Sequence, residues 1–319
     1  MTGTFDSADF YKRLDEMYTT YDNEEIEQFL LTSLDNIENA AIIDGCCCNC
    51  LGAGCVDEEA QKQEELRWAI NRSHGIIVVL NELACFYRGV SRWEECLSTF
   101  ERVKTAMEEA SLTSTDNYAV VILNMAGALR LLNQREKARA YFEKAEAILT
   151  KNGTADPYTM GSLYNNVGLV YQDEKQFSAA AEYFGKALEY TAKIADSAAE
   201  VATGLGNVAL AYFSAGDMEN ANEAIDRSIA IFTDLDEGLN PHYAGTLNTK
   251  AFICYNTGKL EEAVENFELA AEKTEKIFGK NIDYVKACRN CGVVFDKLGE
   301  KQKAEKYRQL ADSAEKELK

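Results

Sequence analysis

Proline, histidine and long apolar runs are scarce or missing in this chain. Two prolines among 319 residues exclude proline-rich linkers and favour helices joined by short turns. The two histidines, His74 and His242, have no serine or cysteine pattern of nucleophilic catalysis near them. The zinc-protease motif, the nucleophile elbow and the phosphate-binding loop are missing as well. These absences indicate a protein that is not an enzyme.

Basic charge is also in deficit, with 33 Lys and Arg against 53 Asp and Glu and a net charge of −20. Such a surface repels phosphate backbones and anionic lipids, so neither nucleic acid nor a membrane is expected as a partner. Residues 1–45 hold eleven acidic residues against Lys12 and Arg13, a net charge of −9. A solvated helical face accounts for this excess, and a docking patch for a basic partner is the alternative.

No apolar run approaches the roughly 18 residues that a membrane-spanning helix needs. The first residues lack a basic segment followed by an apolar one, so they do not read as a signal peptide. We therefore expect a cytoplasmic protein whose thiols are kept reduced.

What the sequence does contain is an internal repeat of about 42 residues. Two series of small residues recur in step, at intervals of 42, 42, 41, 42 and 41. The first series is Ala84, Ala126, Gly168, Ala209, Ala251 and Gly292, and the second is Cys96, Ala138, Ala180, Ala221, Ala263 and Ala304. Apolar residues around them recur at three and four positions, which indicates two amphipathic helices in each repeat.

Small residues at fixed places predict close crossings of the two helices. The turn between them carries Gly216, Gly258 and Gly299 in three repeats, which suits a backbone of positive φ after a helix. Asp156-Pro157 and similar pairs predict helix starts. Because one helix pair cannot bury its apolar face alone, we expect an all-α solenoid of stacked pairs.

This pattern resembles the tetratricopeptide repeat, in the 42-residue variety of kinesin light chains that is also common in bacterial proteins. The resemblance covers about residues 75–319. It implies a right-handed α-α superhelix of about six helix pairs, with a concave groove that binds an extended peptide or a partner helix. We predict an N-terminal helical capping pair at residues 1–43, a Cys/Gly-rich loop insertion at 44–60 and the repeat array at 61–319. Departures from the pattern include Lys250 at an apolar position and Arg308 at a phenylalanine position.

The predicted groove positions lie beside the small residue of each first helix. Asparagine recurs there, although it is a mediocre helix former, and its amide can both donate to and accept from a peptide backbone. The alternative is that these amides bond to neighbouring helices or water. The asparagines are Asn81, Asn124, Asn165, Asn166, Asn207, Asn248 and Asn290.

Basic and aromatic residues occupy other groove positions. Arg88 and Arg130 precede an aromatic strip that includes Phe252 and Tyr255, and Arg289 follows it. Such a strip could seat an acidic or carboxylate-terminated segment, or the aromatic rings could pack between repeats.

Ten cysteines are present, and five of them fall within ten residues: Cys46, Cys47, Cys48, Cys50 and Cys55. Glycines around them allow tight turns that could bring several sulfurs together. We predict a thiophilic metal site, either zinc or an iron–sulfur cluster, with disulfide switching or inert thiols as alternatives. Cys288 and Cys291 instead occupy apolar positions of a repeat helix, and we expect them in the core.

The function favoured by these patterns is a non-enzymatic scaffold that binds a peptide or protein segment. The alternative is a metal- or redox-responsive regulator whose site is the cysteine loop at 46–55. A peptide-pheromone receptor is a third candidate, although no DNA-binding helix-turn-helix region precedes the repeats. The identity of the partner and the oligomeric state are not readable from the sequence.

Overall fold

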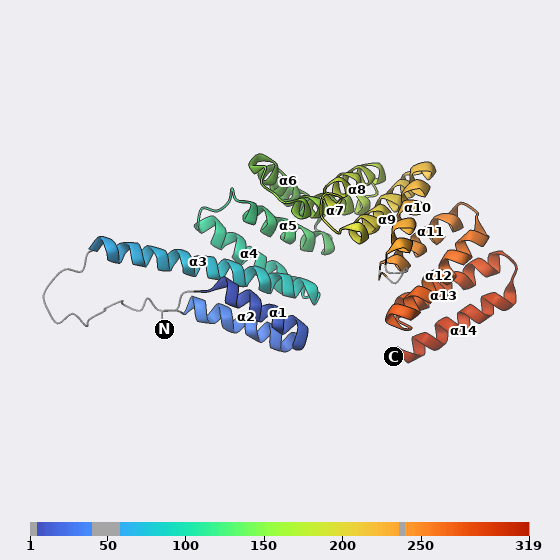
Figure 1. Cartoon of the computed structure of the whole chain (residues 1–319), viewed down its shortest axis with the longest axis horizontal. Coiled ribbons are helices and arrows are strands. Elements are labelled where there is room, and N and C mark those ends of the chain that lie inside the picture. Colours follow the sequence, from blue (N-terminus) through green and yellow to red (C-terminus); the bar gives the residue numbers. More distant parts are fainter. Residues whose placement is uncertain (1–4, 40–57, 236–239, 241, 319) are drawn as a thin grey trace. The chain divides into compact units, whose positions relative to one another are not determined.

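The computed structural model describes residues 5–39, 58–235, 240 and 242–318, and across these ranges the chain forms helices and no strand (Figure 1). This confirms the all-α class. The helices group into two compact units, residues Met1–Ala155 and Asp156–Lys319. None of the described helices combines the length and the apolar character that a membrane span requires.

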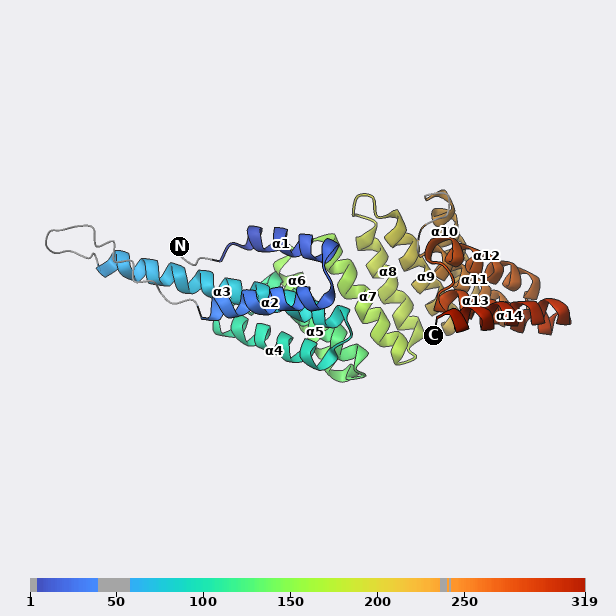
Figure 2. The same cartoon turned by 90° about the horizontal axis from the view of Figure 1, so that it is seen from below.

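The described residues of unit 1 form six helices. They are α1 (Ser7–Thr20), α2 (Asn23–Glu38), α3 (Glu58–Gly89), α4 (Trp93–Glu109), α5 (Asp116–Leu131) and α6 (Arg135–Asn152). The helix α2 starts with a capping box, in which Asp22 and Glu25 satisfy each other's backbone N–H groups. The pair α1 and α2 lies beside the long helix α3 (Figures 1 and 2). Residues 58–60, the end of the predicted loop insertion, already belong to α3.

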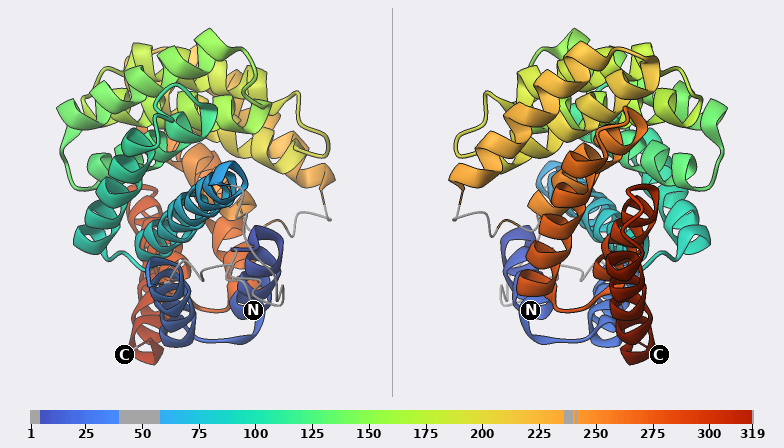
Figure 3. Two further views of the ribbon diagram at one scale, coloured as in Figure 1. Left: turned by 90° about the vertical axis from the view of Figure 1, so that its left-hand side faces the viewer. Right: turned by 90° about the vertical axis from the view of Figure 1, so that its right-hand side faces the viewer.

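Unit 2, over the part of it that the structure describes, forms eight helices in four antiparallel pairs. They are α7 (Pro157–Asp173), α8 (Phe177–Thr191), α9 (Ala198–Ala215), α10 (Met218–Asp234), α11 (Tyr243–Asn256), α12 (Leu260–Phe278), α13 (Ile282–Lys297) and α14 (Lys301–Glu317). As predicted, Asp156 caps α7 by accepting a hydrogen bond from the N–H of Thr159, and Pro157 opens the helix. The last two pairs appear in orange and red in Figure 3.

The small residues sit where the paired helices cross, as the repeat predicts. All members of both series are buried, and the alanines and Cys96 are 0% exposed. The space beside them is filled by large apolar side chains such as Phe100, Phe142 and Phe184, each at most 1% exposed. The core therefore runs along the crossings of each unit.

The turn inside each pair uses a left-handed residue at the same position of the repeat. Gly216, Gly258 and Gly299 have φ values of 86°, 81° and 80°, which confirms the prediction for these three turns. In the first three repeats the position holds Ser91, Asn133 and Lys175, whose φ values are 61°, 60° and 60°. The repeat geometry therefore imposes this backbone even where no glycine is available.

Candidate functional site

A series of three hollows runs along the first helices of the pairs in unit 2. The first lies against α7, α8 and α9 and has a volume of about 330 Å³. The second has about 400 Å³ and the third about 470 Å³, and both lie against α9, α11, α12 and α13. Adjacent hollows share residues: Asn207 lines the first and second, and Asn248 lines the second and third. The three hollows therefore form one surface, the unit 2 groove.

Glycines help to make this groove hollow. Gly245 of α11 has open space where a side chain would begin, and a Cβ on Gly206 of α9 would meet only the hydroxyl of Thr246, at 3.8 Å. Gly204 is different, because a Cβ there would lie 2.6 Å from Cδ2 of Leu188. Glycine within a helix costs about 1 kcal/mol relative to alanine. At Gly206 and Gly245 this cost leaves the groove wall without a side chain.

Asparagines from four successive first helices line the groove. Asn165, Asn207, Asn248 and Asn290 each contribute to at least one hollow. They come from two adjacent positions, because Asn165 and Asn248 lie three residues before the small residue of their helix, whereas Asn207 and Asn290 lie two before it. Both positions therefore supply groove residues, although Asn166, which also lies two residues before the small residue of its helix, does not line a hollow.

Some of these amides already have partners within the protein. The Nδ2 group of Asn207 donates to Oδ1 of Asn165 across the α7–α9 boundary at 3.3 Å. Asn248 donates to the carbonyl of Ala244 at 3.0 Å, and Asn166 donates to the carbonyl of Ser162 at 2.9 Å. Asn166 is not among the lining residues of the groove. The amides of Asn207 and Asn248 keep an acceptor oxygen that these bonds do not use.

The predicted aromatic and basic residues of unit 2 divide between the groove and its surroundings. Phe252 is 46% exposed, lines the third hollow and packs edge to face against Phe213 at 5.6 Å between ring centroids. Tyr255 instead carries the Lys297 ammonium 3.9 Å above its ring, and Arg289 pairs with Glu315 of α14 at 2.6 Å. Tyr255 and Arg289 do not line the groove.

In unit 1, the predicted residues lie in separate places. Arg88 of α3 donates to Oδ1 of Asn124 on α5 at 3.0 Å, so this pair holds neighbouring first helices together. Arg130 is half-buried near the end of α5. Asn81 lines a cavity of about 850 Å³ bordered by α1, α3, α4 and α5. The repeat pattern contains no signal for this cavity.

The cysteines divide into two sets. Cys46, Cys47, Cys48, Cys50 and Cys55, the predicted metal ligands, lie outside the described residues. Cys288 and Cys291 are 0% exposed in the core of unit 2, which confirms their predicted packing role. Burial raises the pKa of both thiols, so neither is a ready thiolate. Across the part of the chain that the structure describes, no group of three or more potential ligands is placed to hold a metal ion.

Comparison with known proteins supports the repeat assignment. Models of the tetratricopeptide repeat match residues 75–151, 159–234 and 244–281. No curated protein matches the sequence significantly.

Several solved structures have a similar fold. BtubC (BKLC) from P. vanneervenii is 19% identical with a TM-score of 0.58, over 72% of this chain and 91% of that one. The repeats of a putative kinesin light chain from Podosopora anserina give 16% identity and 0.52, over 62% and 94%. The apo quorum sensor NprR from B. thuringiensis gives 14% and 0.53, over 96% and 92%. Because the matching repeat models together cover more than half of the sequence, this chain belongs to the tetratricopeptide repeat family.

Proposed function

We propose that the protein is a non-enzymatic scaffold that binds an extended peptide segment of a partner protein in the unit 2 groove. The observation that carries this proposal is the run of three joined hollows lined by asparagines from the first helices of four successive pairs. An amide presents two donors and an acceptor, which match the alternating C=O and N–H groups of an extended peptide without demanding a particular sequence. Such a groove suits a chain-like ligand better than a compact one.

The groove also offers side-chain pockets. Phe252 provides an exposed ring for an apolar side chain of the ligand, and the open spaces at Gly206 and Gly245 admit the ligand backbone close to the helices. Lys286 and Asp283 pair with each other at 3.0 Å beside the third hollow. This pair presents both charges, so it favours neither an acidic nor a basic ligand strongly.

The test fills the groove without disturbing the fold. Peptides selected from a random display library against the full chain are synthesised, and their affinities are measured by fluorescence anisotropy. Gly245→Leu places a good helix former where a Cβ meets nothing within 4 Å, and we expect it to weaken binding at least about tenfold. The matched control is Gly185→Leu on α8, where a Cβ also meets nothing within 4 Å but which does not line the groove.

Gly185→Leu should bind the selected peptides as the unmodified chain does. Asn207→Ala removes an amide, and each hydrogen bond to the peptide that is lost should weaken binding by about 1 kcal/mol, or roughly fivefold in affinity. Unchanged affinity of every selected peptide for Gly245→Leu would contradict the proposal.

A further inference from the structure

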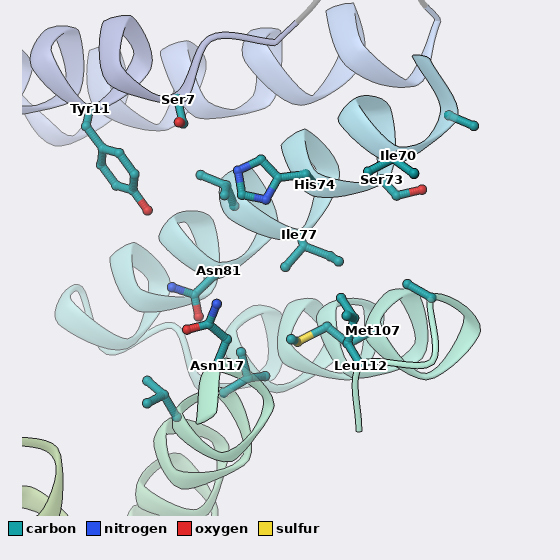
Figure 4. Close-up of a pocket in the computed structure, with 15 residues that line it drawn as sticks. Ser7, Tyr11, Ile70, Ser73, His74, Ile77, Asn81, Met107, Leu112 and Asn117 are labelled. Carbon is teal, nitrogen blue, oxygen red and sulfur yellow. The ribbon is translucent and has the colours of Figure 1, made fainter. Parts of the chain in front are cut away.

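The cavity of unit 1 has walls of a different character from the unit 2 groove. Its volume of about 850 Å³ lies within the range of ligand sites in proteins. Most of its wall is apolar and comes from α3, α4 and α5 and the turn after α4: Ile77, Val78, Met107, Leu112, Val120 and Val121. In Figure 4, Tyr11 of α1 points into it, and Asn81 of α3 and Asn117 of α5 point toward each other.

A partly buried carboxylate is hydrogen-bonded to two residues that line this cavity. Glu82 of α3 accepts hydrogen bonds at Oε1 from the hydroxyl of Tyr11 and from Nδ2 of Asn81, both at 3.3 Å. Burial, with a smaller contribution from the negative charge of Asp15, raises the pKa of Glu82 above its usual range. Both donors are neutral and line the cavity, so they connect the carboxylate to it.

Glu82 has no basic partner among the described side chains. Two arginines of this unit that could pair with Glu82 make other contacts instead. The guanidinium of Arg88 donates to Asn124, and that of Arg13 lies over the ring of Phe29 at 5.1 Å. A partly buried carboxylate without a cationic partner is destabilised by the loss of hydration, and a bound cation would stabilise it.

The cavity also has an acceptor without a partner and an aromatic ring in its wall. Oδ1 of Asn81 is buried and has no hydrogen-bond partner, which is costly unless a donor arrives. Tyr11 of α1, which lines the cavity, is 41% exposed, and its ring could stack on a cation. The cavity and its surroundings therefore offer an apolar wall, an aromatic face, an acceptor without a partner and a negative charge.

We propose that this cavity binds an apolar segment of a partner protein that carries a lysine or arginine. The apolar side chains of the segment pack against Ile77 and Val121, while the cationic group reaches toward Glu82 past Tyr11 and donates to Oδ1 of Asn81. The charge of α1 and α2 and their caps supports this choice, because residues 5–39 hold ten acidic residues against Lys12 and Arg13. This site is distinct from the unit 2 groove, and it selects a basic segment.

The test uses three capped peptides that differ at one residue. Each has four leucines around a central lysine, glutamine or glutamate, with serine and glycine at the ends, and binding to the full chain is followed by fluorescence anisotropy. We expect the lysine peptide to bind at least about tenfold more tightly than the glutamine peptide, and the glutamate peptide to bind weakest. Ile77→Ser should weaken all three peptides.

Glu82→Gln is the decisive variant. It keeps the size of the side chain and removes a charge that burial disfavours, so the melting temperature should not fall. The preference for lysine over glutamine should disappear in Glu82→Gln. It should persist in the control Glu143→Gln, which removes an exposed carboxylate of α6.

Several results would overturn this assignment. They are equal binding of the three peptides, an unchanged lysine preference in Glu82→Gln, and no binding up to about 1 mM. Loss of peptide binding in Gly245→Leu but not in Ile77→Ser would place these peptides in the unit 2 groove instead. A dimer that dissociates on Ile77→Ser, seen by analytical ultracentrifugation, would show that a second copy of the chain occupies the cavity.

Discussion

The crossing of α7 and α8 allows the repeat geometry to be tested with a single methyl group. Gly168 occupies the small-residue position of α7, and a Cβ there would lie 2.7 Å from both Cδ1 and Cε1 of the Phe184 ring. Ordinary carbon contacts are about 3.5–4.0 Å, so Gly168→Ala must displace the ring or the helix by about 1 Å. Phe184 is 1% exposed and packs against Leu205, Val208 and other core residues, so little free space is available.

The magnitude follows from two opposing effects. Overpacking a core costs about 1–3 kcal/mol, while replacing glycine by alanine within a helix gains about 1 kcal/mol. In another repeat Ala126 and Phe142 coexist at the equivalent positions, both buried, so the crossing can widen and the cost should stay below the upper end of this range, at about 2 kcal/mol. We expect Gly168→Ala to lower the free energy of unfolding by about 1 kcal/mol.

The matched variant is Gly185→Ala in the partner helix α8. A Cβ at Gly185 meets nothing within 4 Å, so this change should stabilise unit 2 by about 1 kcal/mol. The two variants should differ by about 2 kcal/mol, or roughly 4–8 °C in melting temperature for a unit of this size. Thermal unfolding followed by circular dichroism measures the difference, and hydrogen exchange locates it in α7 and α8. If Gly168→Ala melts as high as Gly185→Ala, the close crossing does not limit packing there.

Two further predictions concern a buried charge and the cysteine loop. Burial lowers the pKa of Lys250, but its hydrogen bonds to Asp226 at 2.9 Å and Glu262 at 3.1 Å outweigh burial, so the pKa is raised. For Glu262 the balance is reversed: burial raises its pKa, but the interaction with Lys250 outweighs burial, so the pKa is lowered. Lys250→Ala should therefore lower the free energy of unfolding by about 1–2 kcal/mol at pH 7. This loss of stability should become smaller as the pH falls through the lowered pKa of Glu262, and a loss that does not depend on pH would contradict the ion-pair explanation. For residues 46–55, we expect anaerobically purified protein to carry zinc or iron by elemental analysis and to lose it when Cys46, Cys48 and Cys50 become serine, whereas metal-free protein with five titratable loop thiols would refute the prediction.

The repeat period alone was enough to predict the helix pairs and their crossings. Positions such as Ala180 and Gly216 follow from steric needs that recur in each pair, so their chemistry is visible as periodicity. Lys250 broke that periodicity, and the pattern could not tell that Asp226 of α10 and Glu262 of α12 would surround its ammonium group. Contacts of a residue at which one repeat departs from the others cannot be predicted from the repeat pattern.

The candidate sites were harder to predict, because they depend on space as well as residue type. Gly204 and Gly206 look alike in the sequence, yet one avoids Leu188 and the other leaves a groove open. The contact between Tyr11 and Glu82 joins residues 71 positions apart, so neither residue signals the other. The recurring asparagines and Phe252 could be predicted as groove residues. Of two adjacent asparagines, however, Asn165 lines the groove, whereas Asn166 donates to a carbonyl of its own helix.

One substitution within the repeat connects the two proposed sites. Two residues before the small residue of the first helix, four of the six repeats carry asparagine: Asn124, Asn166, Asn207 and Asn290. The first repeat has Glu82 at this position. An amide donates and accepts, whereas an ionised carboxylate only accepts and carries a charge. At equivalent positions of the first helices, the later repeats therefore have an amide that suits a peptide backbone, whereas the first repeat has a carboxylate that suits a cation. On this argument, Glu82→Asn should give the unit 1 cavity the indifference to ligand charge that we expect of the unit 2 groove.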